Sequence, residues 1–497
     1  MKTLKRILSG LMALVLVGAV GALVWADRAH PGAAAPPGAA QMVAVPPGDS
    51  VAVCPGGLRL PTEGAGEPVY DPRFDPAATQ VDSISRVVVE GGQGGRAAPL
   101  EEGAATDLPG PLAAATATVA DQPIRVEAFS TAAAPALAAG GVFQHIGDGD
   151  LRGVAASPCV PPAPEAWVVA GSTEPGSSAR LILANPGLTN VTADLEVWDA
   201  AGPVEAIGLT GLVVPPSSQR AVLLEGFVGD AARLAVHVAA SGGDLAVFLQ
   251  HSRLQGTTQG GVELAVPGLA PATEVVVAGL DVTESTFDSS RACALRVANP
   301  GQEPAAVSVE LWGPDGPTSL PGLEAAAVGA GLVTDLSLAG LPAGRYMAAV
   351  SSDQPVAVAG LSLRAGAADQ PEEFAWTSSS APAAHGFAAL PGADLTWRLV
   401  AGAGADSRLT LTPVGADGQR GAATSLAAPA RTALVVDAGE LGAGQGAAAL
   451  EFAWDGPPGQ VALVASATDS QGELISVLVP LGHWAAATEV AAYPRAP

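Results

Sequence analysis

Lysine is almost missing from this chain: Lys2 and Lys5 are the only lysines among 497 residues, and every other basic residue is arginine. Charged residues make up 14% of the sequence and aromatic residues only 4%. Small aliphatic side chains must therefore supply most of any hydrophobic core. The formal net charge is −25, without a basic stripe that interleaves aromatic residues. Because an acidic surface repels a phosphate backbone, nucleic acid is not an expected partner.

The sequence also lacks the short motifs of common catalytic chemistry. It contains no HExxH or CxxC zinc pattern, no GxxxxGK[ST] phosphate loop and no GxSxG elbow. Among its six histidines only His237 and His251, on candidate strands of one module, suggest a shared site, and packed or solvated histidines are the simpler interpretation. The pair Glu372 and Glu373 predicts a solvated loop, because neighbouring strand residues face opposite sides and cannot flank a glycosidic bond. We expect no catalytic residue, no metal and no cofactor; an active site built from distant residues stays open.

The N-terminus has the pattern of an export signal. Residues 1–6 carry three positive charges, and the uncharged stretch 7–25 would span roughly 28 Å as a helix, close to the bilayer core. We predict a single membrane anchor with its N-terminus inside. A cleaved signal peptide is the alternative, since Val24-Trp25-Ala26 fits a cleavage site. In both cases the later chain, starting with a Pro/Ala-rich linker at 26–50, lies outside the cytoplasmic membrane.

Cysteine placement agrees with export. Cys54 and Cys159 bracket about one domain's length of chain, and we predict a disulfide between them that closes a divergent β domain at 51–162. Cys293 lies in phase with apolar strand residues and is expected to be a small core residue, with a reactive thiol as the alternative.

Internal repeats organise the remaining chain. The segment ARLILANPG at 179–187 returns as CALRVANPG at 293–301, and a weaker third copy, SRLTLTPVGADG, occupies 407–418. We predict three further modules, at 165–270, 271–370 and 371–485. The last segment, 486–497, is expected to be a terminal stub that closes the sheet edge of the last module, or a disordered tail.

Within a module the hydrophobic period is two. In 191–198 the apolar residues alternate with polar ones, as in a half-buried strand. Short strands of this kind, separated by Asn-Pro-Gly and Asp-Gly turns, predict an all-β chain of tandem immunoglobulin-like antiparallel β-sandwich modules. The alternative is a β-propeller-like repeat assembly, although propeller blades usually take only about 40–50 residues.

Two tryptophans break the alternation in equivalent places. Trp198 and Trp312 both fall on the polar face of their strands, beside a turn. A tryptophan there could stack on a sugar ring or anchor a partner protein. Alternatively, each covers the adjacent turn or the neighbouring module.

Several of these segments together resemble a known family. The N-terminal anchor, Cys54-Pro-Gly, GDLRGVAASPC at 149–159, Trp167-Val-Val-Ala-Gly and RLILANPG are similar to an uncharacterised actinobacterial envelope family, defined only as a domain of unknown function. The resemblance implies an exported, membrane-associated protein of a high-GC Gram-positive organism, and it brings no catalytic residues.

Three functions follow as hypotheses. The first is a non-enzymatic extracytoplasmic envelope protein whose module array acts as a scaffold or interaction surface for another envelope protein. The second is a cell-wall glycan-binding array that uses the two tryptophans. The third is a hydrolase with scattered active-site residues.

Overall fold

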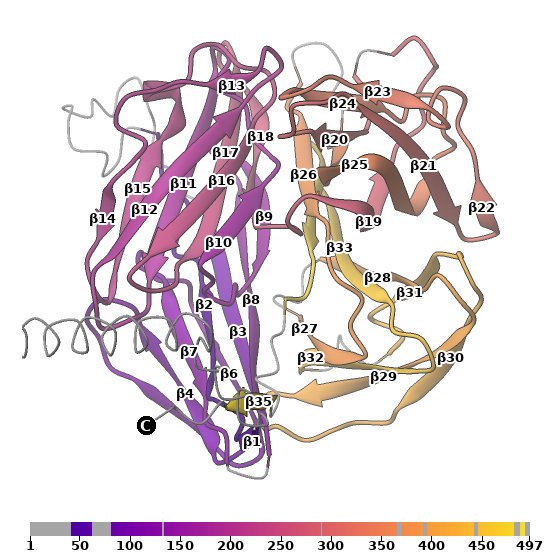
Figure 1. The fold of residues 1–497 in the computed structure, drawn as a ribbon. Helices are drawn as coiled ribbons and strands as arrows, with labels where there is room; N and C mark the ends of the chain where they lie inside the picture. The colour runs from indigo at the N-terminus through magenta and orange to yellow at the C-terminus, as the bar shows by residue number, and fades with distance from the viewer. Residues whose placement is uncertain are drawn as a thin grey trace, which may run out of the picture. The chain divides into compact units, whose positions relative to one another are not determined.

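The computed structural model describes residues 41–61, 81–131, 134–289, 291–364, 370–390, 395–441, 446–481 and 488–492. These residues form β-strands and one short 3-10 helix, η1 (Leu224–Gly226), so the all-β prediction is confirmed (Figure 1). The predicted anchor at 7–25 lies outside the described residues. Among those that are described, no helix is long and apolar enough to cross a membrane.

The larger compact unit, Pro47–Ala485, contains four modules of antiparallel strands. The first module consists of β2 (Ser50–Cys54), β3 (Val81–Gly91), β4 (Gly94–Pro99), β5 (Thr106–Pro109), β6 (Leu112–Ala117), β7 (Ile124–Ala128), β8 (Ala136–Ile146) and β9 (Gly153–Pro158). The second consists of β10 (Glu165–Val168), β11 (Ser177–Asn185), β12 (Val191–Trp198), β13 (Pro203–Val204), β14 (Leu212–Val214), β15 (Ser218–Leu223), β16 (Ala235–Ser241), β17 (Ala246–Gln255) and β18 (Thr258–Ala265). The third consists of β19 (Ala272–Val282), β20 (Ala294–Ala298), β21 (Ala305–Gly313), β22 (Gly316–Thr318), β23 (Ala326–Val328), β24 (Val333–Ser337), β25 (Gly344–Arg364) and β26 (Glu373–Ser378). The fourth consists of β27 (His385–Ala389), β28 (Thr396–Gly402), β29 (Ser407–Gly415), β30 (Thr424–Ala428), β31 (Leu434–Asp437), β32 (Ala447–Asp455), β33 (Gln460–Asp469) and β34 (Gly472–Leu478).

All four modules share one topology. The sheets of the first module run β2-β7-β4-β5 and β6-β3-β8-β9, and those of the fourth run β27-β32-β29-β30 and β31-β28-β33-β34. The second module repeats this order with β10-β16-β12-β13 and β15-β11-β17-β18. In the third, the long strand β25 takes part in both sheets, pairing first with β19 and β21 and then with β20 and β26. Each module is therefore a two-sheet sandwich rather than a single-sheet propeller blade, and the first module belongs to the same series although its sequence conceals this.

The predicted alternation is present in β12, which the other strands of its sheet flank on both sides. Its inward residues, Val191, Ala193, Leu195 and Val197, are buried. Asp194 and Glu196 on the opposite face are exposed. This is the burial pattern of a sheet with one face on the core.

The repeated Asn-Pro-Gly motif fixes a loop. The side-chain amide of Asn185 donates hydrogen bonds to the carbonyl oxygens of Thr189 (2.8 Å) and Val214 (3.0 Å). Asn299 makes the equivalent bonds to Glu303 (2.8 Å) and Val328 (3.3 Å). The motif is thus a structural element that satisfies buried carbonyl groups where two strands end.

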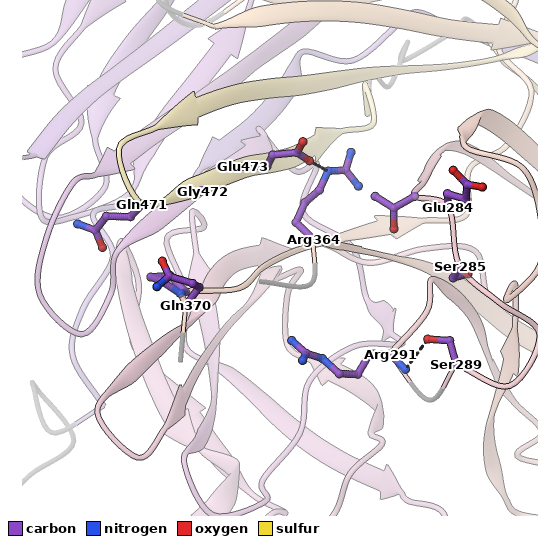
Figure 2. A pocket seen from close by; sticks show the side chains of 11 residues that line it. Glu284, Ser285, Ser289, Arg291, Arg364, Gln370, Gln471, Gly472 and Glu473 are labelled. Carbon is purple, nitrogen blue, oxygen red and sulfur yellow. Dashed lines mark hydrogen bonds and ion pairs between the residues drawn. The ribbon is translucent and has the colours of Figure 1, made fainter. Parts of the chain in front are cut away.

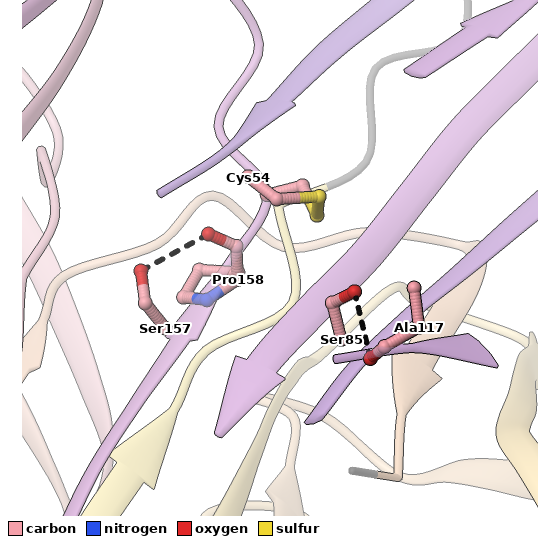
Figure 3. The surroundings of a disulfide bond; sticks show 6 residues. Cys54, Ser85, Ala117, Ser157 and Pro158 are labelled. Carbon is pink, nitrogen blue, oxygen red and sulfur yellow. Dashed lines mark hydrogen bonds between the residues drawn. A yellow bond between two sulfur atoms is a disulfide. The ribbon is translucent and has the colours of Figure 1, made fainter. Parts of the chain in front are cut away.

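Cys54 and Cys159 form the predicted disulfide within the first module (Figure 3). Both are fully buried, and the adjacent Val53 and Val160 exchange two backbone hydrogen bonds of 2.8 and 2.7 Å. A Cβ atom at Gly140 would lie 2.6 Å from the Cys159 sulfur, so only glycine fits beside the bond. The disulfide therefore joins β2 to the end of the module.

Buried apolar clusters also lie between modules. The first and second modules share one, the second and third share a continuous core, the third and fourth share another, and a further cluster joins the fourth to the first. Representative members, in that order, are Val160 with Phe248, Leu234 with Leu295, Met347 with Val464, and Leu137 with Phe387. The contacts between modules therefore close into a cycle, which a chain of independent beads would not form.

The described residues of the smaller unit form a two-stranded antiparallel sheet. Its strands β1 (Gln41–Val45) and β35 (Thr488–Ala492) pair from Gln41 opposite Ala492 to Val45 opposite Thr488. The prediction that the C-terminal stub closes the last module's edge is therefore wrong: its partner lies within the stretch expected to be linker. An edge strand pairs with any strand that satisfies its backbone groups, and local sequence does not identify that partner.

Candidate functional site

Trp198, one of the two candidate interaction residues, is only 9% exposed. Its ring stacks on Trp167, with centroids 5.2 Å apart, and Trp167 stacks in turn on His237 at 4.5 Å. Trp198 lies on the polar face of its sheet, as alternation predicts, but the ring of Trp167 covers it there. It is not available to a glycan.

Trp312 is 4% exposed and packs against the fourth module, where Val400 and Val464 belong to the same cluster. Its indole N–H donates to Glu310 (2.8 Å), which also pairs with Arg431 of the fourth module (3.1 Å). Trp312 therefore covers the neighbouring module, which is the alternative stated for it. A glycan-binding role is not compatible with this burial.

Replacing Trp312 with alanine is expected to lower the free energy of unfolding by about 3 kcal/mol, because a large cavity opens between two modules. Thermal unfolding measures this loss. Phe287→Ala is the control, since Phe287 is 69% exposed and its removal should change stability little. An unchanged melting temperature in Trp312→Ala, together with weaker binding to isolated cell wall, would contradict the buried role.

A second candidate is the junction where the last strands of the modules meet. Each of β9, β18, β26 and β34 contacts two of the others. The fully buried carboxylate of Glu373 on β26 accepts hydrogen bonds from the backbone N–H groups of Val154 (3.1 Å), Val262 (3.2 Å) and Phe374 (3.2 Å). One side chain thus satisfies edge groups of three modules.

Glu263 on β18 has a matching role. It is fully buried, accepts the N–H of Leu264 (2.9 Å) and accepts the hydroxyl of Ser476 on β34 (2.7 Å). The Ser476 hydroxyl oxygen also accepts the N–H of Ala156 on β9 (2.7 Å). Inward-pointing charged groups at strand edges prevent uncontrolled edge pairing, and here they also connect the modules.

The junction corrects the prediction of a solvated loop at Glu372 and Glu373, which are 3% and 0% exposed. Burial raises the pKa of Glu263 and of Glu373 well above the usual glutamate range. The nearby charge of Glu263 raises the pKa of Glu373 further. Raised carboxyl pKa values often mark acid–base catalysts. Full burial keeps both groups away from a substrate, so we interpret the pair as structural.

These pKa shifts predict a pH dependence of stability. A carboxyl group whose folded-state pKa exceeds its unfolded value, about 4.3, stabilises the fold at low pH and loses that contribution as pH rises through the folded-state pKa. The free energy of unfolding of Glu263→Gln/Glu373→Gln should therefore fall less steeply above pH 5 than that of the unchanged chain. Denaturant unfolding at several pH values tests this. All other titrating groups occur in both proteins and cancel in the comparison, so equal slopes would contradict the prediction.

A third cluster joins the first and fourth modules. Ligand atoms of Glu90, His385 and Glu451 lie within 4.8 Å of one another, a spacing that a metal ion could use. Arg420, however, pairs with both carboxylates, with its Nε 2.5 Å from Glu451. Burial acts to raise the pKa of Glu451, but hydrogen bonds from His385 and Arg420 outweigh it and lower the pKa to about 2. The guanidinium already supplies the positive charge, so the cluster is an ion-pair network.

His237 and His251 do not form a common site. His237 lies on β16 and bonds Glu196 at 2.9 Å, whereas His251 lies on β17 of the other sheet. His251 is buried and accepts the indole N–H of Trp376 (3.1 Å). Burial and the nearby charges of Arg253 and Arg296 lower its pKa well below the usual value, so it is neutral. Cys293 is also buried, and its amide and carbonyl neighbours suit a core thiol.

Two of the open cavities adjoin each other beside the third module. The larger, about 640 Å³, is lined by residues of the third and fourth modules that include Arg291, Arg364 and Glu473 (Figure 2). Arg364 pairs there with Glu473 (3.2 Å) and with Asp281 (2.9 Å). The positive charge of this guanidinium is therefore compensated by two carboxylates of the protein.

The smaller cavity, about 460 Å³, lies between the second and third modules, and Ser289 and Arg291 line both cavities. We call it the arginine cleft, and its charged lining residues are Arg233, Arg253, Arg291, Asp335 and Glu372. The strands fix these positions, because Arg253 lies near the end of β17, Asp335 lies on β24 and Glu372 immediately precedes β26.

Sequence reasoning missed this cleft. Its arginines are far apart in the chain and separately resemble solvated surface residues. The only signal was their rarity in an acidic chain, which does not reveal that they converge.

The fold and the cavities define an all-β protein of four interlocked sandwich modules with clefts between them. The chain belongs to a family of unknown function, DUF5719, which matches residues 113–439, about two thirds of its length. The match begins in the first module and ends in the fourth, and it confirms the expected membership of an uncharacterised family. No curated protein and no solved structure matches the chain.

Proposed function

We propose that this protein is a non-enzymatic extracytoplasmic envelope protein whose four modules form one scaffold that presents an interaction surface to another envelope protein. The observation that carries the proposal is the closed cycle of buried contacts between modules. A cycle holds surface loops of different modules at fixed positions relative to one another. Such an arrangement suits a surface that recognises a partner protein better than it suits an extended spacer. Actinobacterial origin and attachment through residues 7–25 are parts of the same proposal, supported by the arginine-rich, lysine-poor composition and the N-terminal pattern.

The buried disulfide supports an oxidising compartment, because such bonds persist mainly outside the cytoplasm. The glycan-binding alternative loses its main support, since both of its tryptophans are buried.

Protease treatment of intact cells that express the chain tests the location. We expect the protease to degrade the modules while cytoplasmic proteins remain intact. Protection of the modules until the cells are lysed would contradict an outside location.

Sedimentation with purified peptidoglycan and arabinogalactan tests the function, because a protein scaffold should show no saturable glycan binding. Cross-linking in intact cells should then recover one reproducible protein partner, and saturable glycan binding would favour the alternative.

A further inference from the structure

The arginine cleft holds more positive than negative charge, although the whole chain is strongly acidic. Four guanidinium groups gather at it, since Arg296 lies directly behind the lining residues and shares Asp335 with Arg233. Among the residues that the structure describes, two carboxylates, Asp335 and Glu372, line the cleft. About two positive charges are therefore left uncompensated.

Three of the four arginines have partners. Arg296 makes a bidentate pair with Asp335 (2.8 and 3.1 Å) and lies over the Trp376 ring at 4.6 Å. Arg233 lies 3.1 Å from the same carboxylate, and Arg291 pairs with Glu372. These contacts hold the walls of the cleft in place before any ligand arrives.

Arg253 is the exception. In the part of the chain that the structure describes, its guanidinium has no hydrogen bond and no ion pair, and Glu174 attracts it only at a distance. The side chain is half-buried, so water compensates its charge incompletely. Burial and repulsion by Arg291 both disfavour its charged form. A guanidinium in this position gains from any anion that enters between it and Arg291.

We propose that the arginine cleft binds an oxyanion group, a phosphate or a carboxylate, between Arg253 and Arg291. The planar guanidinium forks suit the paired oxygens of such a group. The cavity admits a small anion or the end of a larger ligand, while the acidic surface around it repels polyanions such as nucleic acid. The site does not depend on the proposed scaffold function.

Isothermal titration calorimetry of the full chain tests the site, with inorganic phosphate in one arm, succinate in the other and ionic strength held constant with sodium chloride. We expect saturable binding of at least one anion, and the arm that binds identifies the group. Arg253→Gln should weaken that binding about tenfold or more. Arg408→Gln is the matched control, because Arg408 is exposed on β29 in the fourth module, and it should bind as the unchanged chain does.

Absence of saturable binding by the unchanged chain, or equal affinity in Arg253→Gln, would overturn the proposal. Circular dichroism establishes whether each variant is folded. If Arg253→Gln does not fold, Arg253→Lys decides, since it keeps the charge but loses the fork: weaker binding supports the proposal, and unchanged affinity overturns it.

Discussion

Replacing Glu373 with alanine should destabilise the protein by roughly 4–6 kcal/mol, the largest effect expected of any single substitution considered. The carboxylate accepts three backbone N–H groups, and each buried donor that loses its acceptor costs about 1–3 kcal/mol. Alanine offers no oxygen, and the strands must then separate or admit water. Denaturant unfolding followed by circular dichroism measures the loss.

Two variants control this experiment. Glu274→Ala removes an exposed glutamate from β19 and should change stability by less than about 0.5 kcal/mol. Glu373→Gln keeps one carbonyl oxygen for two of the donors but places an NH₂ group at the third, so we expect an intermediate loss. If Glu373→Ala proved as stable as Glu274→Ala, the Glu373 carboxylate would not be the group that satisfies the backbone N–H groups of the junction.

The junction shows where sequence reasoning reached its limit. Period-two alternation correctly predicts which side chains of β12 face the core of their own sandwich. It contains no information on what covers the outer face. For this reason the sequence left Trp312 open between a ligand-binding and a covered position, and Glu373 was expected in a solvated loop. Their surroundings come from other modules, distant in the chain.

Local chemistry was the more reliable guide. Asn185 and Asn299 make the same hydrogen bonds in two modules, so the repetition of their turn motif in the sequence identified the repeated module. The first module escaped this comparison because it lacks the motif, although its strand order is the same. The arginine cleft could not be predicted at all, since Arg253 and Arg291 line a common cavity only after two modules have packed.

The disulfide provides the second large effect. Cys54 and Cys159 are 105 residues apart, and in the chain-entropy account a cross-link over about 100 residues stabilises by up to roughly 4.7 kcal/mol, chiefly by restricting the unfolded chain. We expect Cys54→Ala/Cys159→Ala to lose about 4 kcal/mol, seen as a lower melting temperature in calorimetry. The two backbone bonds between Val53 and Val160 remain in this variant, so the native contacts of β2 should persist.

A reductant supplies the control for the disulfide within the same experiment. The unchanged protein is unfolded and refolded in the presence of dithiothreitol, so that its buried disulfide is reduced. Its melting temperature should then fall to that of Cys54→Ala/Cys159→Ala. The same treatment should not change the melting temperature of the variant, because its remaining cysteine, Cys293, is a free thiol in both proteins. A variant that melts with the oxidised parent would show that packing around the buried cysteines, rather than the covalent loop, holds the first module together.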